Sequence, residues 1–209
     1  MTENRWISVV ATGEATVAPD LAVVSFAVSG SGKRLGPARD DVSARSSSVL
    51  ARLRDLGVAD GDLNAPDVAI HPEYDFRKGQ RLTGYRAVRQ MTAKVRDLDR
   101  LGEVLDALVA AGANEVHGAQ MSAADPSAAE HEALRAAMSA ARAKAEALAD
   151  AGGATLGALA RVEEEHTGGV PMPRMRMMGA MEMAADVPTE VAAGDLTVTR
   201  QIRAWFDTA

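Results

Sequence analysis

Hydrophobic and polar residues alternate in several parts of the chain, which is the period of a β-strand with one buried face. The clearest case is the last strand, where apolar residues share one parity: Leu196, Val198, Ile202, Ala204 and Phe206. The other expected strands cover residues 6–12, 22–28, 68–76, 85–95, 115–121 and 156–164. The pair Lys78-Gly79 predicts a hairpin between two of them, and Pro72 predicts an edge strand or a bulge in its first arm.

Three segments follow the helical period instead. The first begins at Gly36-Pro37 and ends at Gly57, and the second runs from a capping Asp97 to Gly112. The third starts near residues 125–127, at an Asp-Pro pair or a Ser/Glu capping box, and ends at residues 152–153. Its predicted buried stripe consists mostly of small residues, which would let it lie close to a sheet: Leu134, Met138, Ala141, Ala145 and Leu148.

This order of elements predicts an α+β fold, with a largely antiparallel sheet and about three helices packed on one face. The hairpin and the mixed order of strands and helices exclude a purely parallel, doubly wound sheet. We expect a single domain over residues 1–209, interrupted by a long irregular segment at 166–190. The two halves show no residue-level repeat that would indicate duplication.

Composition narrows the class of protein. The 209 residues are 47% hydrophobic and 25% charged, which is ordinary for a soluble globular protein. The absence of cysteine excludes disulfides, thiolate metal sites and a cysteine nucleophile. A net charge of −6 and only 3% aromatic residues argue against nucleic acid as a partner.

No segment has the length and hydrophobicity of a membrane span or a secretory signal. The first apolar run, residues 6–11, is short and ends at Thr12, Gly13 and Glu14. We therefore expect a cytoplasmic protein, or an envelope or periplasmic one if a leader preceded residue 1 and was removed.

Two motifs could carry chemistry, and each has an ordinary structural explanation. The glycines of residues 30–36 follow a strand and precede a helix, but their spacing does not match a dinucleotide-binding loop. His71, Glu73 and Asp75 share one face of a strand, where they could hold a divalent cation or simply protect an edge. We favour the second interpretation and expect these side chains to face solvent without binding metal tightly. The sequence identifies no catalytic residue, cofactor or metal ligand.

A methionine-rich segment, residues 171–183, holds six of the ten methionines and follows neither period. Thioether side chains suit an adaptable contact surface, a sink for oxidants or a Cu(I) site. The segment could also be a loop without a specific role. We favour the contact surface and predict that four methionines are covered by a neighbouring subunit or partner: Met175, Met177, Met178 and Met181.

Short motifs in a consistent order resemble the SIMPL-domain family of bacterial proteins. The first are Thr12-Gly13-Glu14-Ala15, Ala18-Pro19-Asp20, Leu56-Gly57-Val58 and Thr83-Gly84-Tyr85-Arg86-Ala87. They continue with Val95-Arg96-Asp97-Leu98, Ala111-Gly112-Ala113-Asn114, Lys144 to Ala149, Leu156-Gly157 and Ala193-Gly194-Asp195. Two features depart from the family: the chain lacks a leader, and Ala15 stands where a second glycine is common.

The resemblance implies an α+β fold, assembly into large oligomers and a link to oxidative-stress defence, often in the cell envelope. It supplies no catalytic residue. We therefore expect a non-enzymatic homo-oligomer with a scaffolding or stress-protective role, which binds itself and at most another protein. The alternatives are a carrier of a small ligand or metal, using the methionine-rich segment or the face of His71, and an enzyme of unknown class.

Overall fold

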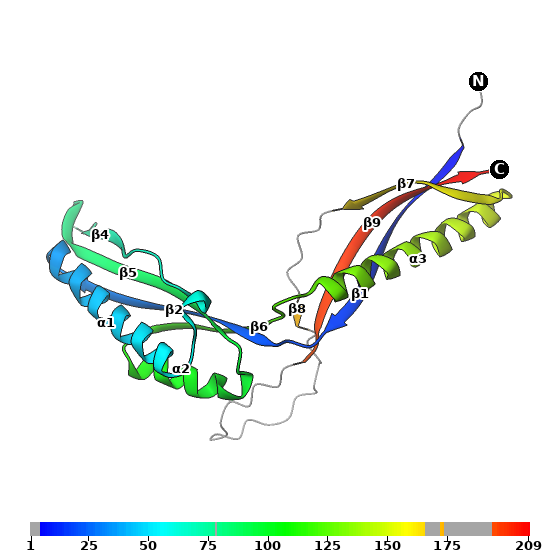
Figure 1. The fold of residues 1–209 in the computed structure, drawn as a ribbon. Helices are drawn as coiled ribbons and strands as arrows, with labels where there is room; N and C mark the ends of the chain where they lie inside the picture. Colours follow the sequence, from blue (N-terminus) through cyan, green and yellow to red (C-terminus); the bar gives the residue numbers. More distant parts are fainter. Residues whose placement is uncertain (1–4, 78, 166–171, 174–193) are drawn as a thin grey trace, which may run out of the picture. The chain divides into compact units, whose positions relative to one another are not determined.

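A computed structural model describes residues 5–77, 79–165, 172–173 and 194–209. The described chain forms two compact units, which we treat separately (Figure 1). The middle unit is Asp20–Ser122, and the terminal unit combines the residues before and after it. Every pair of named strands is antiparallel, and three α-helices pack on the sheets, so the α+β class is confirmed. The assignment of the whole chain to a single domain stays a prediction.

The terminal unit is a sheet in the order β1-β9-β7 with one long helix. Its strands are β1 (Trp6–Val17), β7 (Leu156–Glu165) and β9 (Leu196–Thr208), and the short β8 (Met172–Pro173) also pairs with β9. Helix α3 (Ser127–Gly152) lies along one face of β1 and β9 (Figure 1). The core between them is formed by Val9, Ala11, Ala137, Ala141, Ala145, Ile202, Ala204 and Phe206.

Helix α3 approaches the sheet closely because its buried stripe is made only of alanine. The stripe repeats every fourth residue: Ala129, Ala133, Ala137, Ala141, Ala145 and Ala149. The predicted stripe was right in its small residues but wrong at Leu148, which is half-exposed. On β1 the matching position is Gly13, where a Cβ atom would lie 2.1 Å from the carbonyl oxygen of Ala133. A side chain at residue 13 is therefore excluded by the helix backbone.

The start of α3 is capped from outside the helix. Asp125 Oδ1 accepts a hydrogen bond from the backbone N–H of Ser127 at 3.0 Å and another from the Ser127 hydroxyl. Glu130 makes an ion pair with Arg200 of β9. The structure lies between the two starts that the sequence left open, because Pro126 occupies the N-cap position and Ser127 is the first helical residue.

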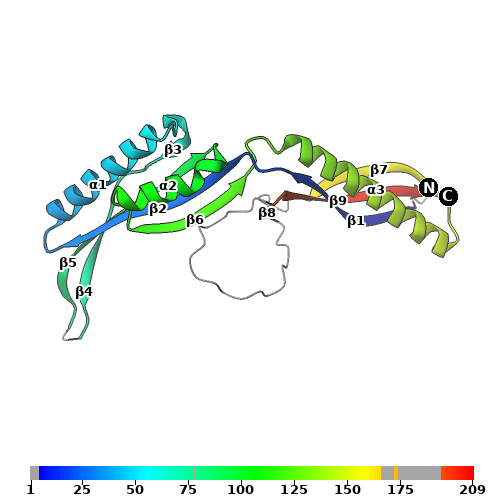
Figure 2. The same ribbon diagram turned by 90° about the horizontal axis from the view of Figure 1, so that it is seen from below.

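The middle unit is a second antiparallel sheet, in the order β3-β5-β2-β6, with β4 also paired to β5. Its strands are β2 (Leu21–Gly32), β3 (Leu63–Asn64), β4 (Ala69–Asp75), β5 (Arg81–Val95) and β6 (Glu115–Ser122). Helix α1 (Leu35–Asp55) packs on β2 and β5, and α2 (Leu101–Ala110) packs beside α1 (Figure 2). The largest fully buried side chains of this unit include Val24, Phe26, Val28, Val42, Val49, Leu53, Met91, Leu101 and Leu108.

Two details of the middle unit test the sequence predictions. The β4–β5 hairpin is confirmed, and Pro72 lies in a strand that pairs with β5 alone and shifts register between Glu73 and Tyr74. The prediction that Asp97 caps the second helix is wrong. A 3₁₀ turn, Leu98–Arg100, precedes α2, and the Asp97 side chain makes no capping hydrogen bond.

Candidate functional site

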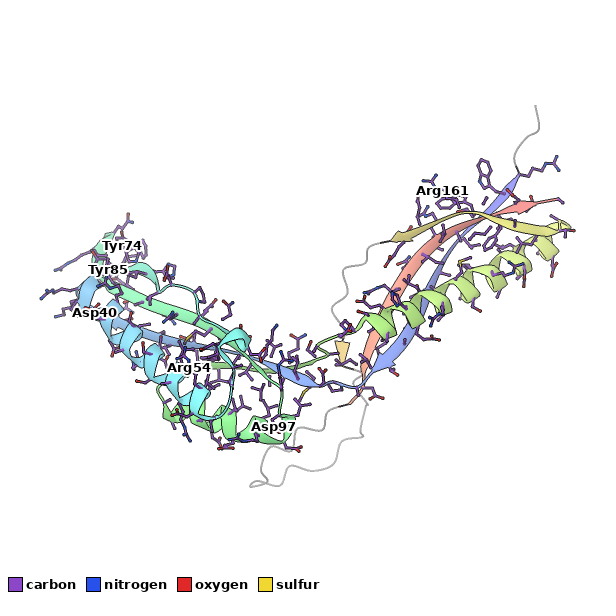
Figure 3. The ribbon with its side chains drawn as sticks, in the orientation of Figure 1. Asp40, Arg54, Tyr74, Tyr85, Asp97 and Arg161 are labelled. Carbon is purple, nitrogen blue, oxygen red and sulfur yellow. The ribbon has the colours of Figure 1, made fainter. Side chains whose placement is uncertain are left out.

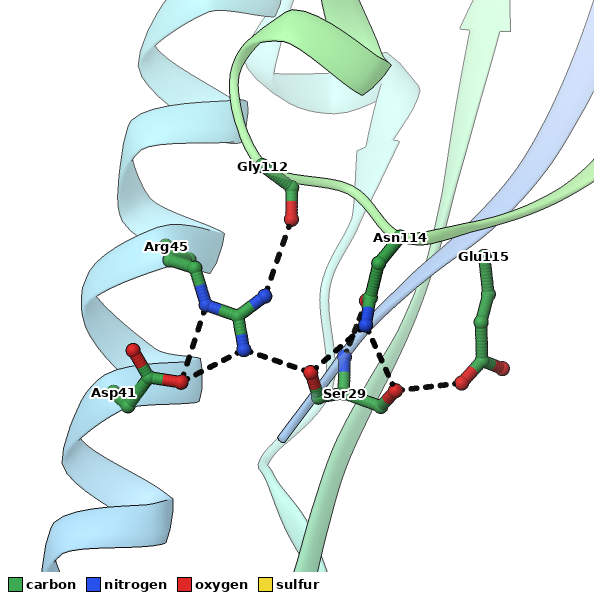
Figure 4. Close-up of polar contacts among 6 residues, drawn as sticks. All are labelled: Ser29, Asp41, Arg45, Gly112, Asn114 and Glu115. Atoms are coloured by element: carbon green, nitrogen blue, oxygen red, sulfur yellow. Dashed lines mark hydrogen bonds and ion pairs between the residues drawn. The ribbon is translucent and has the colours of Figure 1, made fainter. Parts of the chain in front are cut away.

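A polar cluster joins β2, α1 and the segment between α2 and β6 (Figure 4). Its centre is Ser29, a polar residue of β2 that is only 9% exposed. The Asn114 side chain continues the β-ladder beside it: Oδ1 accepts from the Ser29 N–H at 2.8 Å, and Nδ2 donates to the Ser29 carbonyl at 3.0 Å. The amide thus satisfies backbone groups that β6 does not reach.

Arg45 of α1 connects the helix to this cluster. Its Nη2 donates to the Ser29 carbonyl and to Asp41 Oδ2, both at 2.7 Å, and its Nη1 donates to the Gly112 carbonyl at 3.4 Å. Gly30 provides the space, because a Cβ there would lie 2.9 Å from Arg45 Nη2. The guanidinium therefore connects helix α1 to strand β2 and to the segment between α2 and β6.

Glu115 is the ionisable group on the other side of Ser29. One oxygen, Oε1, accepts from the Ser29 hydroxyl at 2.6 Å and from Arg86 Nη2 at 2.9 Å. The hydrogen bond from Ser29, helped by Arg86, lowers the pKa of the Glu115 carboxyl below its usual range. Glu115 is consequently a carboxylate at neutral pH, which suits an acceptor rather than a proton donor.

A shallow groove lies beside Arg86 and Glu115 on the sheet face away from α1. It has a volume of about 530 Å³, and its lining is Pro66, Asp67, Ala69, His71, Arg86, Val88, Gln90 and Glu115. A smaller hollow of about 280 Å³ shares two of these residues, Pro66 and Gln90, and adds His117. Both offer mixed donors and acceptors to a small polar molecule. In the part of the chain that the structure describes, no serine or threonine hydroxyl is hydrogen-bonded to a histidine.

The structure places the three residues predicted to face solvent on β4. His71 and Asp75 are exposed, and Glu73 is half-buried and accepts from the Ser31 hydroxyl at 3.3 Å. Asp75 Oδ1 accepts from the backbone N–H of Arg77 at 2.8 Å, as in an Asx turn. Within the described ranges, no group of three or more His, Asp or Glu side chains is arranged to hold a metal ion.

The structure also bears on the glycine-rich segment and the methionine-rich segment that the sequence analysis singled out. The glycines at residues 30 and 32 belong to β2, whose partners are both antiparallel, so a dinucleotide-binding βαβ unit is not formed there. The four predicted contact residues, Met175, Met177, Met178 and Met181, lie outside the described residues.

The sequence analysis did not predict the polar cluster of Ser29, Asn114 and Arg45. The available signal was a serine within β2, and Ser25 and Ser31 share it.

Strand β1 forms one edge of its sheet. Within the described residues it pairs with β9 alone, in an unbroken register from Trp6↔Asp207 to Val17↔Leu196. The backbone N–H of Thr208 donates to the Arg5 carbonyl, so odd-numbered residues of β1 face β9 and even-numbered ones direct their backbone groups outward. One outward carbonyl, that of Val10, accepts from Lys144 Nζ at 3.1 Å.

The other sheet edges are shorter or interrupted, whereas the pairing of β1 is regular throughout the described residues. Register shifts interrupt the pairing of β4, β6 and β7, and β4 also contains Pro72. Strand β3 has only two residues. Proline, bulges and short strands are common devices that prevent edges from pairing with other chains. Strand β1 has twelve residues, a single charged residue (Glu14) and none of these interruptions.

The two-unit α+β architecture can now be compared with known proteins. The sequence profile of SIMPL, described as a protein of unknown function (DUF541), matches residues 7–206. The chain therefore belongs to the SIMPL family.

Its relatives include the uncharacterized protein YggE of Edwardsiella ictaluri, 33% identical over 84% of this chain and 75% of the relative. YggE of Escherichia coli strain K12 is 31% identical over 82% of this chain and 71% of its own length. The 26 kDa periplasmic immunogenic protein of Brucella melitensis is 29% identical over 99% of this chain and 86% of the relative. None of these three names describes an enzymatic activity. In the described part of this chain, none of the helices is long and apolar enough to cross a membrane.

Proposed function

We propose that this protein is a non-enzymatic member of its family that self-associates and acts as a scaffold. The observation that carries the proposal is the long, regular edge of β1, which no proline or register shift interrupts within the described residues. Two copies of this strand can pair antiparallel about a twofold axis, because the same edge is present on each copy. Glu14 is the only charged side chain in the strand, so pairing brings few like charges together.

The outward backbone groups of β1 are the basis of the test. Thr12 is exposed, and its N–H points away from β9. Proline at this position removes a donor from the free edge while leaving the ladder to β9 in place. Thr12→Val is the matched control, because it changes the side chain and keeps the N–H.

Sedimentation velocity at several protein concentrations measures the effect. We expect the wild type and Thr12→Val to sediment as oligomers, and Thr12→Pro to sediment more slowly with an unchanged far-UV circular dichroism spectrum. A wild type that remains monomeric over the whole concentration range would refute the proposal. Equal oligomers in all three proteins would place the interface elsewhere.

The finer parts of this proposal rest on the family. A stress-protective role is implied only by the resemblance, and a location in the envelope is supported by the printed name of the Brucella relative. The contact role of Met175, Met177, Met178 and Met181 also stays a prediction.

A carrier of a small polar ligand is the second candidate, and the groove beside His71 favours it. Arg86 and Gln90 offer donors there, and Asp67 offers a carboxylate. Native mass spectrometry of protein purified from cells separates the two candidates. A stoichiometric bound molecule supports the carrier, and a ligand-free homo-oligomer supports the scaffold.

A further inference from the structure

The β4–β5 hairpin extends past the rest of its sheet. The pairing of β2 with β5 ends at Gly32↔Tyr85, whereas β4 continues to pair with β5 as far as Asp75↔Arg81. Residues 73–77 and 79–84 therefore form a two-stranded arm beyond the end of β2, which Figure 2 shows clearly. An isolated pair of strands buries little apolar surface of its own.

The arm carries apolar side chains that remain in water. Tyr74 is 41% exposed, Phe76 72% and Leu82 45%, and Phe76 is the most exposed large hydrophobic side chain of the described residues. The rings of Tyr74 and Phe76 lie with their centroids 6.3 Å apart, and both remain partly in water. Figure 3 shows Tyr74 near the end of the arm. Local hydrogen bonds hold the arm together, including one from Thr83 Oγ1 to the Glu73 carbonyl at 2.9 Å.

The charges around these side chains point to the kind of partner. Most arginines of the described chain make ion pairs or donate to carbonyl groups. Arg77 and Arg81 of the arm make no such contact among the described residues, and Arg5, Arg34 and Arg52 elsewhere make none either. The arm also carries two carboxylates: Glu73 accepts from the Ser31 hydroxyl, and Asp75 accepts from the backbone N–H of Arg77. The turn itself, residues 77–81, contains three basic residues and no acidic one, so residues 73–84 have a net charge of +1 in a chain whose net charge is −6. This arrangement favours an anionic partner.

We propose that the arm docks on the surface of an anionic lipid membrane. Three apolar side chains are too few for a stable protein interface, which buries about 800 Å² on each partner. They suffice to enter the headgroup region, where tyrosine is favoured and arginine keeps its charge in water while its stem covers apolar surface. Each arginine near an anionic leaflet adds electrostatic attraction that salt screens.

The test is co-sedimentation with phosphatidylcholine vesicles, with and without phosphatidylglycerol, at low and high salt. We expect the wild type to bind only the anionic vesicles and to be released by salt. Phe76→Ser should weaken binding by about tenfold to a hundredfold, the equivalent of one buried phenyl ring. The double variant Arg77→Gln/Arg81→Gln should lose the preference for phosphatidylglycerol.

Val109→Ser is the control, because Val109 is 62% exposed on α2, outside the arm. It should bind vesicles like the wild type. Failure of the wild type to bind anionic vesicles, or equal losses in Val109→Ser and Phe76→Ser, would overturn the proposal. So would a change of oligomeric state in lipid-free Phe76→Ser with vesicle binding intact, because the arm would then contact another copy. Thr12→Pro should retain vesicle binding, which separates this proposal from assembly through β1.

Discussion

Substitution of Gly13 by alanine tests the close packing of α3 on β1. An added Cβ would lie 2.1 Å from the Ala133 carbonyl oxygen and 2.2 Å from the Ala137 nitrogen. Real Cβ atoms essentially never approach other atoms within 3.0 Å, and both neighbours are helix backbone. No change of rotamer relieves the contact, so the helix must move away from the sheet.

The expected cost follows from that movement. Overpacking of a core generally costs about 1–3 kcal/mol, and a clash with backbone lies at the upper end. Lifting the helix also exposes part of the alanine stripe, at about 0.8 kcal/mol for each buried methyl or methylene group. Alanine also lowers the conformational entropy of the unfolded chain, which offsets about 0.4–1 kcal/mol of this loss in stability. We therefore expect a loss of about 2–3 kcal/mol in the free energy of unfolding.

The assay is urea unfolding followed by tryptophan fluorescence. Both tryptophans, Trp6 and Trp205, belong to the terminal unit, and both tyrosines belong to the middle unit. With an urea slope of about 1–3 kcal/mol/M, the tryptophan transition should move to lower urea by about 1 M or more.

The matched control is Gly152→Ala, because a Cβ at the last residue of α3 meets nothing within 4 Å. Its transition should stay in place or move to slightly higher urea. If Gly13→Ala unfolds at the same urea concentration as Gly152→Ala, the close approach of helix and strand is wrong.

Two further predictions concern the polar cluster of the middle unit. Arg45→Met should cost about 1–3 kcal/mol in urea unfolding followed by circular dichroism, because it leaves carbonyl groups without a charged donor. Arg39→Met, which breaks only an exposed ion pair, should cost less than about 1 kcal/mol, and equal losses would contradict the role given to Arg45. Glu115→Gln tests the lowered pKa that Ser29 and Arg86 cause. Above about pH 4.3, the ordinary pKa of glutamate in the unfolded chain, the wild type should be more stable than this variant. The difference should disappear as the pH falls through the lower pKa of Glu115 in the folded protein. A stability difference that is independent of pH would contradict that shift.

The sequence determined much of the local structure, because period, glycine and proline act within a few residues. The alternation in β9 predicted a strand, and the small residues of α3 predicted a helix lying close to its neighbour. The order of elements predicted the α+β class, and Pro72 predicted an edge strand. The prediction that Asp97 caps α2 was wrong because a 3₁₀ turn separates the two. The preference of aspartate for helix starts does not indicate whether such a turn comes first.

Only the tertiary structure decided which distant residues meet. Ser29 and Asn114 are 85 positions apart, and nothing in the intervening sequence indicates that the amide completes the ladder beside β2. The need for glycine at residue 13 likewise depends on the backbone of α3, more than a hundred residues away. Strand pairing in register and the approach of a helix to a sheet are long-range contacts. Among the described residues, they determine that β1 pairs on one side only and how far the β4–β5 arm extends, and both proposals depend on them.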